Sequence, residues 1–255
     1  MSMPLPASIR STPSPAVLLA AIALVVAVPA SAQSLPPAPA DEPVVVVVRV
    51  PRPWYAPTIL VTSRMRDTLP QYASLNGLAF KAYSYDRADG RYGGLYLWRD
   101  AASASAWFDP AWFERVERER GAKADVRRLA APVTIDNVAG GTPESDHADG
   151  IATLVSVPIP PGIDRARLVQ GFRAAVPQYA ASPGLLRKSF TIGEDGTFGG
   201  LYLWRDEASA RRWFDGAWHA KVKATYGAQA SIEWYDTPIL LPTRVAANRV
   251  ATVAP

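Results

Sequence analysis

Apolar residues recur in the same order twice along this chain. Residues 44–50 and 151–157 are runs of β-branched and other apolar residues, a pattern typical of strands buried on both faces. Prolines follow each run, and then come segments with apolar residues at helical spacing, at 58–68 and 164–175. The inward faces of these predicted helices carry Leu60, Met65 and Leu69 in the first copy and Leu168, Phe172 and Val176 in the second.

Alternating residues then predict a β-hairpin in each copy. Its strands are expected at 78–85 and 92–98 in the first copy, and at 185–192 and 198–204 in the second. Each pair of strands flanks a short turn rich in Asp and Gly. A second helix and a last strand follow each hairpin.

Proline, aspartate and glycine mark the boundaries of the helices. Proline ends a helix, aspartate caps its first turn, and glycine stops its last turn. These markers are Pro70 and Pro177 at the end of the first helix, Asp100 and Asp206 at the start of the second, Pro110 and Gly216 at a break within it, and Gly121 and Gly227 at its end.

The pattern repeats because the sequence itself repeats. GGLYLWRD occurs at 93–100 and again at 199–206, and LPQYASLNGLAFKAY at 69–83 matches VPQYAASPGLLRKSF at 176–190. The two copies are 107 residues apart before the hairpin turn and 106 after it, since that turn is one residue longer in the first copy. Length changes of this kind are tolerated in turns, so the chain is predicted to be a duplicated domain.

Each copy has the order βαββαβ, which is typical of a ferredoxin-like sheet with helices on one face. In residues 95–98 the leucines and the aromatic residues alternate, so neither face of this strand is polar. We therefore predict an α+β protein in which the sheets of two tandem ferredoxin-like βαββαβ repeats close into one barrel-like core. The expected divisions are a signal peptide at 1–32, a flexible segment at 33–43, repeat 1 at 44–138, a linker at 139–150, repeat 2 at 151–245 and a tail at 246–255.

The first residues have the composition of an export signal. Arg10 precedes an apolar run at 16–28, and small residues at Ala30 and Ala32 fit a cleavage site before Gln33. The run is short for a bilayer span, so no stable membrane insertion is expected after its removal, with an uncleaved anchor as the alternative. The predicted location is the periplasm or the extracellular medium.

Composition excludes several kinds of chemistry. The chain of 255 residues has a formal charge of +4, and its basic residues are dispersed, so no nucleic-acid partner is expected. It has no Cys and two His, which excludes a thiolate nucleophile and a cysteine zinc site and leaves no multi-histidine metal site. Asp146, His147 and Asp149 are interpreted as a solvated linker. Carboxylates, Arg, Lys, Tyr and Trp remain as the chemically active groups.

The string from Gly199 to Ala210, with its twin from Gly93, resembles the signature of YdhR-like proteins, a family within the dimeric α+β barrel superfamily that includes the antibiotic-biosynthesis monooxygenases. The resemblance covers about residues 44–138 and 151–245, and it implies a dimer fused into one chain, an intramolecular dimeric α+β barrel that could be monomeric. It further implies an oxygenase without a cofactor, in which Trp, Tyr and Asn donors hold a phenolic or enolic substrate in a dry pocket.

A related haem-degrading branch also has a Trp nine residues after the strand Trp, as at Trp107 and Trp213. The position of its haem-ligating His is occupied here by Glu117 and Lys223. Because this ligand is missing, neither haem nor another cofactor is predicted. His219, on the same predicted helix, is the one candidate ligand left. The first copy has Phe113 where the second has His219.

Aromatic side chains are the strongest candidates for a binding site, with core packing as the competing interpretation of each. Indole N–H and phenol O–H groups could orient a small apolar or aromatic molecule in a pocket in each half. Arg99 and Arg205 are interpreted as surface residues, and Lys81 and Lys188 as residues of a solvated face. The candidates are Tyr96, Trp98, Trp107, Trp112, Tyr202, Trp204, Trp213, Trp218 and His219.

Two functions remain open from the sequence. The first is a monooxygenase that acts on a small aromatic or phenolic compound without a cofactor. The second is a non-catalytic carrier or sensor of such a compound in the cell envelope. A fold hosts many activities, so the sequence pattern does not choose between them.

Overall fold

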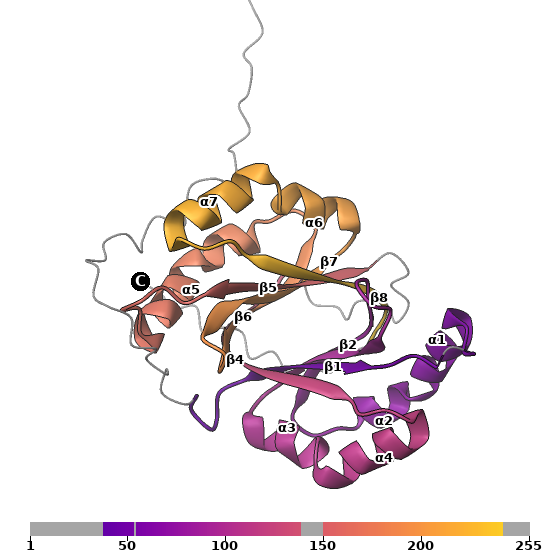
Figure 1. The fold of residues 1–255 in the computed structure, drawn as a ribbon. Coiled ribbons are helices and arrows are strands. Elements are labelled where there is room, and N and C mark those ends of the chain that lie inside the picture. The colour runs from indigo at the N-terminus through magenta and orange to yellow at the C-terminus, as the bar shows by residue number, and fades with distance from the viewer. Residues whose placement is uncertain (1–37, 54, 139–149, 242–255) are drawn as a thin grey trace, which may run out of the picture.

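The strands of both repeats form a single closed barrel in the computed structural model, which describes residues 38–53, 55–138 and 150–241 (Figure 1). The first half contains β1 (Val44–Val50), α1 (Thr58–Asp67), α2 (Leu69–Ala73), β2 (Leu78–Asp86), β3 (Tyr92–Trp98), α3 (Ala101–Trp107), α4 (Pro110–Arg120) and β4 (Asp125–Asp136). The second half contains β5 (Ile151–Pro158), α5 (Arg165–Ala180), β6 (Leu185–Gly193), β7 (Thr197–Trp204), α6 (Glu207–Trp213), α7 (Gly216–Tyr226) and β8 (Ser231–Leu240). The predicted signal peptide, most of the linker and the predicted tail lie outside the described residues.

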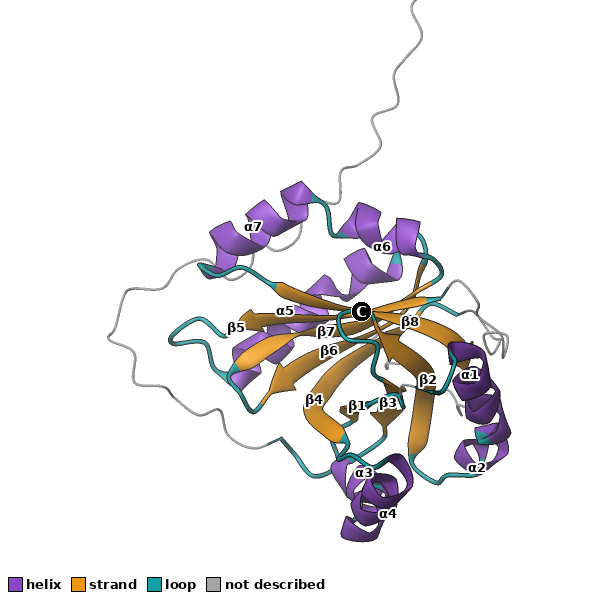
Figure 2. Ribbon diagram, turned by 45° about the vertical axis from the view of Figure 1, so that its right-hand side comes forward, coloured by secondary structure: helices purple, strands orange, loops and turns teal. Residues whose placement is uncertain are grey.

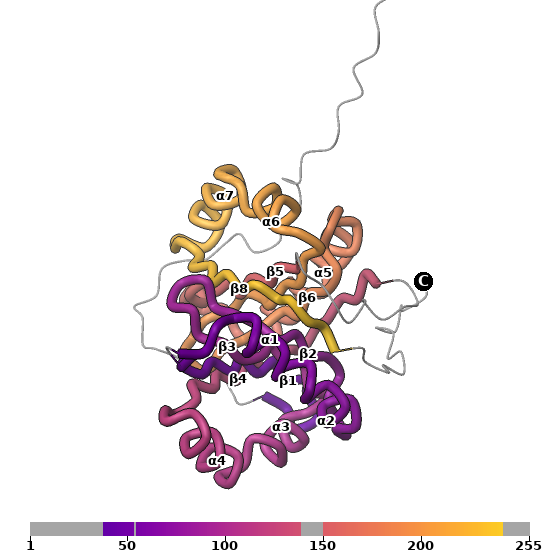
Figure 3. The backbone as a smooth tube through the Cα atoms, turned by 90° about the vertical axis from the view of Figure 1, so that its right-hand side faces the viewer, coloured from indigo at the N-terminus to yellow at the C-terminus, as the bar shows by residue number. Residues whose placement is uncertain are grey.

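Strand pairing confirms the predicted fold. The order around the barrel is β1-β3-β2-β8-β5-β7-β6-β4, with antiparallel neighbours. Each half therefore keeps the ferredoxin-like order, with its first strand between its third and its last. The pairs β2–β8 and β4–β6 join the halves. Figures 2 and 3 show the helices of the two halves on opposite outer sides of the strands.

Alternation along the strands separates an aliphatic interior from an aromatic exterior. Leu95 and Leu201 lie in a buried cluster inside the barrel that combines residues of both halves. Tyr96 and Trp98 point the other way, into the layer between the first sheet and its helices, and Tyr202 and Trp204 do the same in the second half. Each sheet thus buries its leucine face on the other sheet and its aromatic face on its own helices.

Glycine is required at the two positions of the repeated Gly-Gly string for different structural reasons. A Cβ at Gly93 would lie 2.0 Å from the Val48 carbonyl oxygen, so β1 and β3 approach too closely for any side chain there. A Cβ at Gly94 would lie 2.9 Å from the Tyr96 ring. The first glycine permits strand packing, and the second leaves space for the tyrosine on the outer face.

The second helices are capped and interrupted as predicted. The side chains of Asp100 and Asp206 accept hydrogen bonds from the backbone N–H groups of Ser103 and Ser209, at 2.6 and 2.7 Å. Breaks separate α3 from α4 and α6 from α7, and Gly121 ends α4 in a left-handed conformation. The sequence prediction did not include the additional caps at Asp109 and Asp215, which start α4 and α7.

Two predictions for the first helices are wrong. Leu60 is 49% exposed, and its neighbour Val61 is buried instead, because α1 is turned to pack Val61 and Met65 on Tyr83 and Ile239. Pro177 does not end α5, which continues to Ala180.

The position of Thr68 explains why the helix breaks near Pro70 and continues through Pro177. The Thr68 hydroxyl donates to the Met65 carbonyl at 2.8 Å and also contacts the Tyr83 hydroxyl at 2.6 Å. The bond to the Met65 carbonyl competes with the helical backbone hydrogen bonds at the junction of α1 and α2. The equivalent residue in α5 is Ala175, which is buried and has no hydroxyl. The helix therefore extends far enough to bury Tyr179, at the expense of the hydrogen bond that a proline cannot donate.

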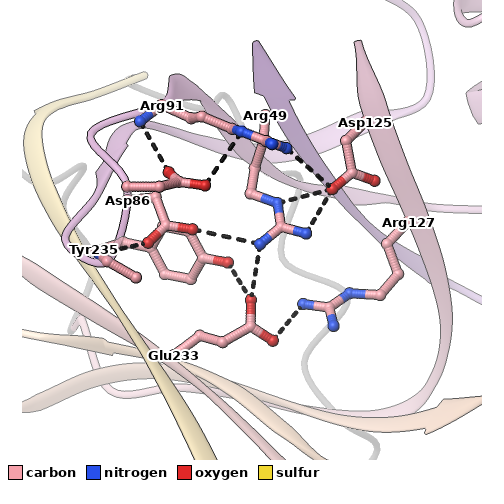
Figure 4. Close-up of polar contacts among 9 residues, drawn as sticks. Arg49, Asp86, Arg91, Asp125, Arg127, Glu233 and Tyr235 are labelled. Atoms are coloured by element: carbon pink, nitrogen blue, oxygen red, sulfur yellow. Dashed lines mark hydrogen bonds and ion pairs between the residues drawn. The ribbon is translucent and has the colours of Figure 1, made fainter. Parts of the chain in front are cut away.

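An ionic network closes one end of the barrel interior (Figure 4). Arg49 donates to Asp125, and its Nη1 also lies 3.3 Å from Asp86 and 3.4 Å from Glu233. Glu233 in turn accepts from Arg127 at 2.7 Å and from the Tyr235 hydroxyl at 2.6 Å. Residues of β1, β2, β4 and β8 meet here, so the network ties the two halves together.

Residues at equivalent repeat positions meet across the barrel with complementary chemistry. Arg127 and Glu233 are 106 residues apart and form an ion pair. Phe80 and Arg187, 107 apart, meet with the guanidinium carbon 4.7 Å from the ring centroid. A symmetric dimer has the same residue at both members of such a pair. The duplicated chain has diverged so that each half complements the other.

We predict that Arg127→Glu, which places like charges at this pair of positions, lowers the free energy of unfolding by roughly 1–3 kcal/mol. Arg173→Glu, on the exposed face of α5, is the matched control and should change it by less than about 0.5 kcal/mol. Urea denaturation followed by tryptophan fluorescence measures both. Equal, small effects would show that the ion pair does not contribute to the joining of the halves.

Candidate functional site

A cavity of about 460 Å³ lies on the outer face of the first sheet, where the helices of that half cover it. Its floor is formed by residues of β1, β2 and β3, and its walls by α1, α2 and α4. Three of the four predicted site residues of this half, Tyr96, Trp107 and Trp112, line it. The cavity is therefore a pocket of small-molecule size with aromatic walls.

Lys81 is the unexpected residue of this site. It was predicted to be solvated, but it is 1% exposed and lines the cavity, because β2 is covered on both faces. Its amine lies over three tyrosine rings, with Nζ 2.9 Å from the centroid of Tyr72, 3.7 Å from that of Tyr83 and 4.9 Å from that of Tyr96. Among the described residues, its contacts are with these rings, and no carboxylate pairs with it.

Burial lowers the pKa of the Lys81 amine well below its usual value, since the charged form loses its hydration. The faces of the three tyrosine rings attract an ammonium group and act in the opposite direction. Burial also raises the pKa of Tyr96 well above the usual value and that of Tyr72 and Tyr83 less strongly. The tyrosines therefore remain neutral hydroxyl groups, and the lysine is the basic group of the cavity.

Cationic side chains are concentrated at the cavity. Arg64 on α1 and Arg115 and Arg120 on α4 line it, against one carboxylate, Glu119. The charges of Arg115 and Arg120 also favour ionisation of Tyr72, although burial outweighs them. The cavity thus combines apolar and aromatic walls with a positive surrounding.

The second half has the same lysine in a filled environment. Lys188 was also predicted to be solvated and is 2% exposed, and its Nζ donates to the Tyr202 hydroxyl at 2.8 Å. Phe172 takes the place of Met65 and stacks on Phe190 with ring centroids 4.8 Å apart. Phe198 packs on Tyr226, which replaces Arg120. Large rings thus occupy the space that is a cavity in the first half.

The remaining predicted residues are placed as follows. Trp98 and Trp204 are buried against Phe108 and Phe214, and the Trp204 indole donates to Thr153 at 3.1 Å. Trp213 and Trp218 are half-buried against other aromatic rings, and Tyr202 is buried beside Lys188. His219 is exposed on α7, next to Trp218. In the described part of the chain, the buried indole N–H groups of Trp98, Trp107 and Trp213 have no hydrogen-bond partner, and of these three residues Trp107 lines the cavity.

A second cavity, of about 670 Å³, lies at the end of the barrel opposite the ionic network. Phe80, Trp98, Leu203 and Arg187 are among its lining residues. Arg187 there already pairs with Asp136 at 3.0 Å. Each cavity has an indole N–H without a hydrogen-bond partner, from Trp107 in the first and from Trp98 in the second. The first cavity differs in having a buried amine, that of Lys81, with no ion-pair partner among the described residues.

Within the ranges that the structure describes, no group of three or more acidic or histidine side chains is placed to hold a metal ion. A search of the same ranges finds no helix that is long and apolar enough to cross a membrane.

Sequence reasoning missed Lys81, Tyr72 and Tyr83 as site residues. The signal was present in β2, where Lys81 and Tyr83 occupy alternate positions on the face opposite Phe80 and Ala82. Once a barrel is predicted, both faces of such a strand are expected to be covered, which contradicts a solvated lysine.

Comparisons with solved structures agree with the fold. A protein of Fusobacterium nucleatum named a "putative monooxygenase" matches with a TM-score of 0.59 and 12% identity over 79% of this chain and 94% of its own. A protein of the same name from Lactobacillus acidophilus matches with a TM-score of 0.55 and 11% identity over 79% of this chain and 96% of its own. A match of that extent is longer than either half, so it includes strands of both. No family model and no curated protein sequence matches the chain.

We predict that Lys188→Met stabilises the protein at neutral pH. The pKa of Lys188 is lowered from 10.5 by burial, so the unfolded chain takes up a proton below pH 10.5 that the folded chain does not. The stability of the wild-type protein therefore falls as the pH drops from 10.5 toward the lowered pKa, and this part of the pH dependence is absent in the variant. Urea denaturation of both proteins from pH 7 to 10.5 measures it, and parallel curves would contradict the prediction.

Proposed function

We propose that this chain is an exported monooxygenase that needs no cofactor and oxidises a small phenolic or enolic compound in the cavity of its first half. The observation that carries the proposal is the cavity of about 460 Å³ with Tyr96, Trp107 and Lys81 in its lining. The fold shared with two proteins named as monooxygenases supports it, as does the resemblance of the repeated Gly-Gly-Leu-Tyr-Leu-Trp string to the YdhR-like signature. Export rests on the composition of residues 1–32.

The proposed chemistry uses the substrate itself as the reductant. The neutral keto form of such a substrate has a ring carbon that bears two hydrogens. Loss of one of them as a proton gives an electron-rich anion, which reacts with O₂ at that carbon. That carbon becomes a carbonyl with one oxygen atom, and the other oxygen leaves as water with the two hydrogens. The protein's part is to exclude bulk water and to place the donors, among them the indole N–H of Trp107, where negative charge develops.

A non-catalytic carrier is the second candidate. It is favoured by the apolar surface where α1 borders the cavity, since Tyr55 and Leu60 line the cavity and are also exposed. An apolar entrance suits a compound that is taken up and released without change.

We expect the purified protein to consume O₂ when it is supplied with anthrones, ketones whose enol tautomers are oxidisable phenols, and we expect Met65→Phe to abolish the reaction. The substitution places in the first half the ring that fills the second half at Phe172. An oxygen electrode and product mass spectrometry measure turnover. Ile59→Phe, at an 81% exposed position of the same helix, is the matched control and should retain activity.

Three outcomes separate the candidates. Turnover that is lost in Met65→Phe and kept in Ile59→Phe supports the oxygenase. Saturable binding of phenols without O₂ consumption supports the carrier and rejects the oxygenase. Equal binding by wild-type protein and Met65→Phe places the ligand outside this cavity and rejects both candidates at this site.

A further inference from the structure

The amine of Lys81 differs from an ordinary buried lysine in its partners. Ammonium groups in protein interiors are normally held by carboxylates or by several hydrogen-bond acceptors. Among the described residues Lys81 contacts three tyrosine rings instead. Its counterpart Lys188 also lies over three aromatic rings, but it donates in addition to the Tyr202 hydroxyl. Lys81 is therefore a basic group with no paired carboxylate among the described residues, and it lines a cavity that a ligand can fill.

The other ionisable groups of the cavity do not replace Lys81 as the base. Tyr72 on α2, Tyr83 on β2 and Tyr96 on β3 surround the amine, and burial raises the pKa of all three, so they stay protonated. Arg64, Arg115 and Arg120 are cations that cannot accept a proton. Glu119 is exposed on the last turns of α4, at the solvent side of the cavity lining.

We propose that Lys81 is the proton acceptor for an acidic ligand of this cavity, and that the ligand is a phenol bound as its phenolate beside the resulting ammonium group. The phenolic O–H bond breaks and an N–H bond of Lys81 forms, so no proton is exchanged with solvent and no oxidant is needed. This inference rests on the cavity of the proposed function, and it names the residue that produces the reactive anion there.

The surroundings stabilise the products of this transfer. The new ammonium group lies over the faces of three tyrosine rings, which attract a cation. The phenolate is attracted by that ammonium and by the arginines of α1 and α4. Charges that are unfavourable singly in the cavity thus form together as a pair when the ligand binds.

A nitrophenol is a suitable probe, because its phenolate absorbs at a longer wavelength than the neutral phenol. At a pH below the free probe's own pKa, we expect wild-type protein to bind one probe per chain with the phenolate spectrum. Titration calorimetry in two buffers of different ionisation enthalpy should show no net proton release, since the proton moves to Lys81. The methyl ether of the probe has no proton to transfer and should bind without a spectral change.

Variants test the assignment of the base. Lys81→Met should still bind the methyl ether but should lose the phenolate spectrum of the nitrophenol and bind it at least about tenfold more weakly, equivalent to one pKa unit. Lys188→Met removes the equivalent amine from the filled half and should behave as wild type. Circular dichroism and the methyl-ether affinity establish that the Lys81→Met cavity is intact.

Each contrary result has a distinct meaning. A neutral-phenol spectrum in the wild-type complex, or a phenolate spectrum retained in Lys81→Met, overturns the role of Lys81 while leaving the pocket in place. A phenolate spectrum with one proton released per ligand also overturns it, because Lys81 is then already charged before binding. Failure of both the phenol and its methyl ether to bind rejects the cavity as a ligand site and with it the proposed function.

Discussion

Coverage of both faces of every strand is the constraint on which this structure depends. A ferredoxin-like sheet has helices on one face and leaves the other open. Here the open faces of two sheets meet and close through β2–β8 and β4–β6, so that leucines and valines of both halves form one interior. The helices cover the outer faces, and few strand residues are fully exposed, although β4 and β8 include several that are partly exposed. A polar side chain on either face must then be paired, caged or exposed to a cavity.

The buried lysines follow from that constraint. Lys81 and Lys188 occupy the same position of the repeat and both project toward the helices, where an aromatic layer receives them. The two halves share the same fold and the same buried lysine, and they differ in the size of the side chains packed above that lysine. Met65 and Arg120 leave a cavity above Lys81, whereas Phe172 and Tyr226 fill the same region above Lys188. The first half therefore has a cavity beside its buried lysine, and in the second half aromatic rings pack in the equivalent region.

Fusion of the halves is what permits this asymmetry. Two identical subunits have the same residue on both sides of a two-fold axis, so an ion pair such as Arg127–Glu233 cannot form between equivalent positions. In one chain each copy can change independently, and the complementary pairs at the two ends of the barrel favour one arrangement of the halves. The same freedom allows the residues above Lys81 and those above Lys188 to differ, as Met65 and Phe172 do.

The sequence by itself determined the duplicated domain, the order of its strands and helices, their caps and breaks, and the aromatic candidates, because these depend on local patterns and on self-similarity. It could not place Lys81, since a lysine in a strand is solvated or buried according to what covers that strand. It could not show that Leu60 faces outward, that α5 continues through Pro177, or that the halves differ in free volume. Those features were decided by tertiary packing, in which the burial of Tyr179, Val61 and the ring of Phe172 outweighs the local preference of each segment.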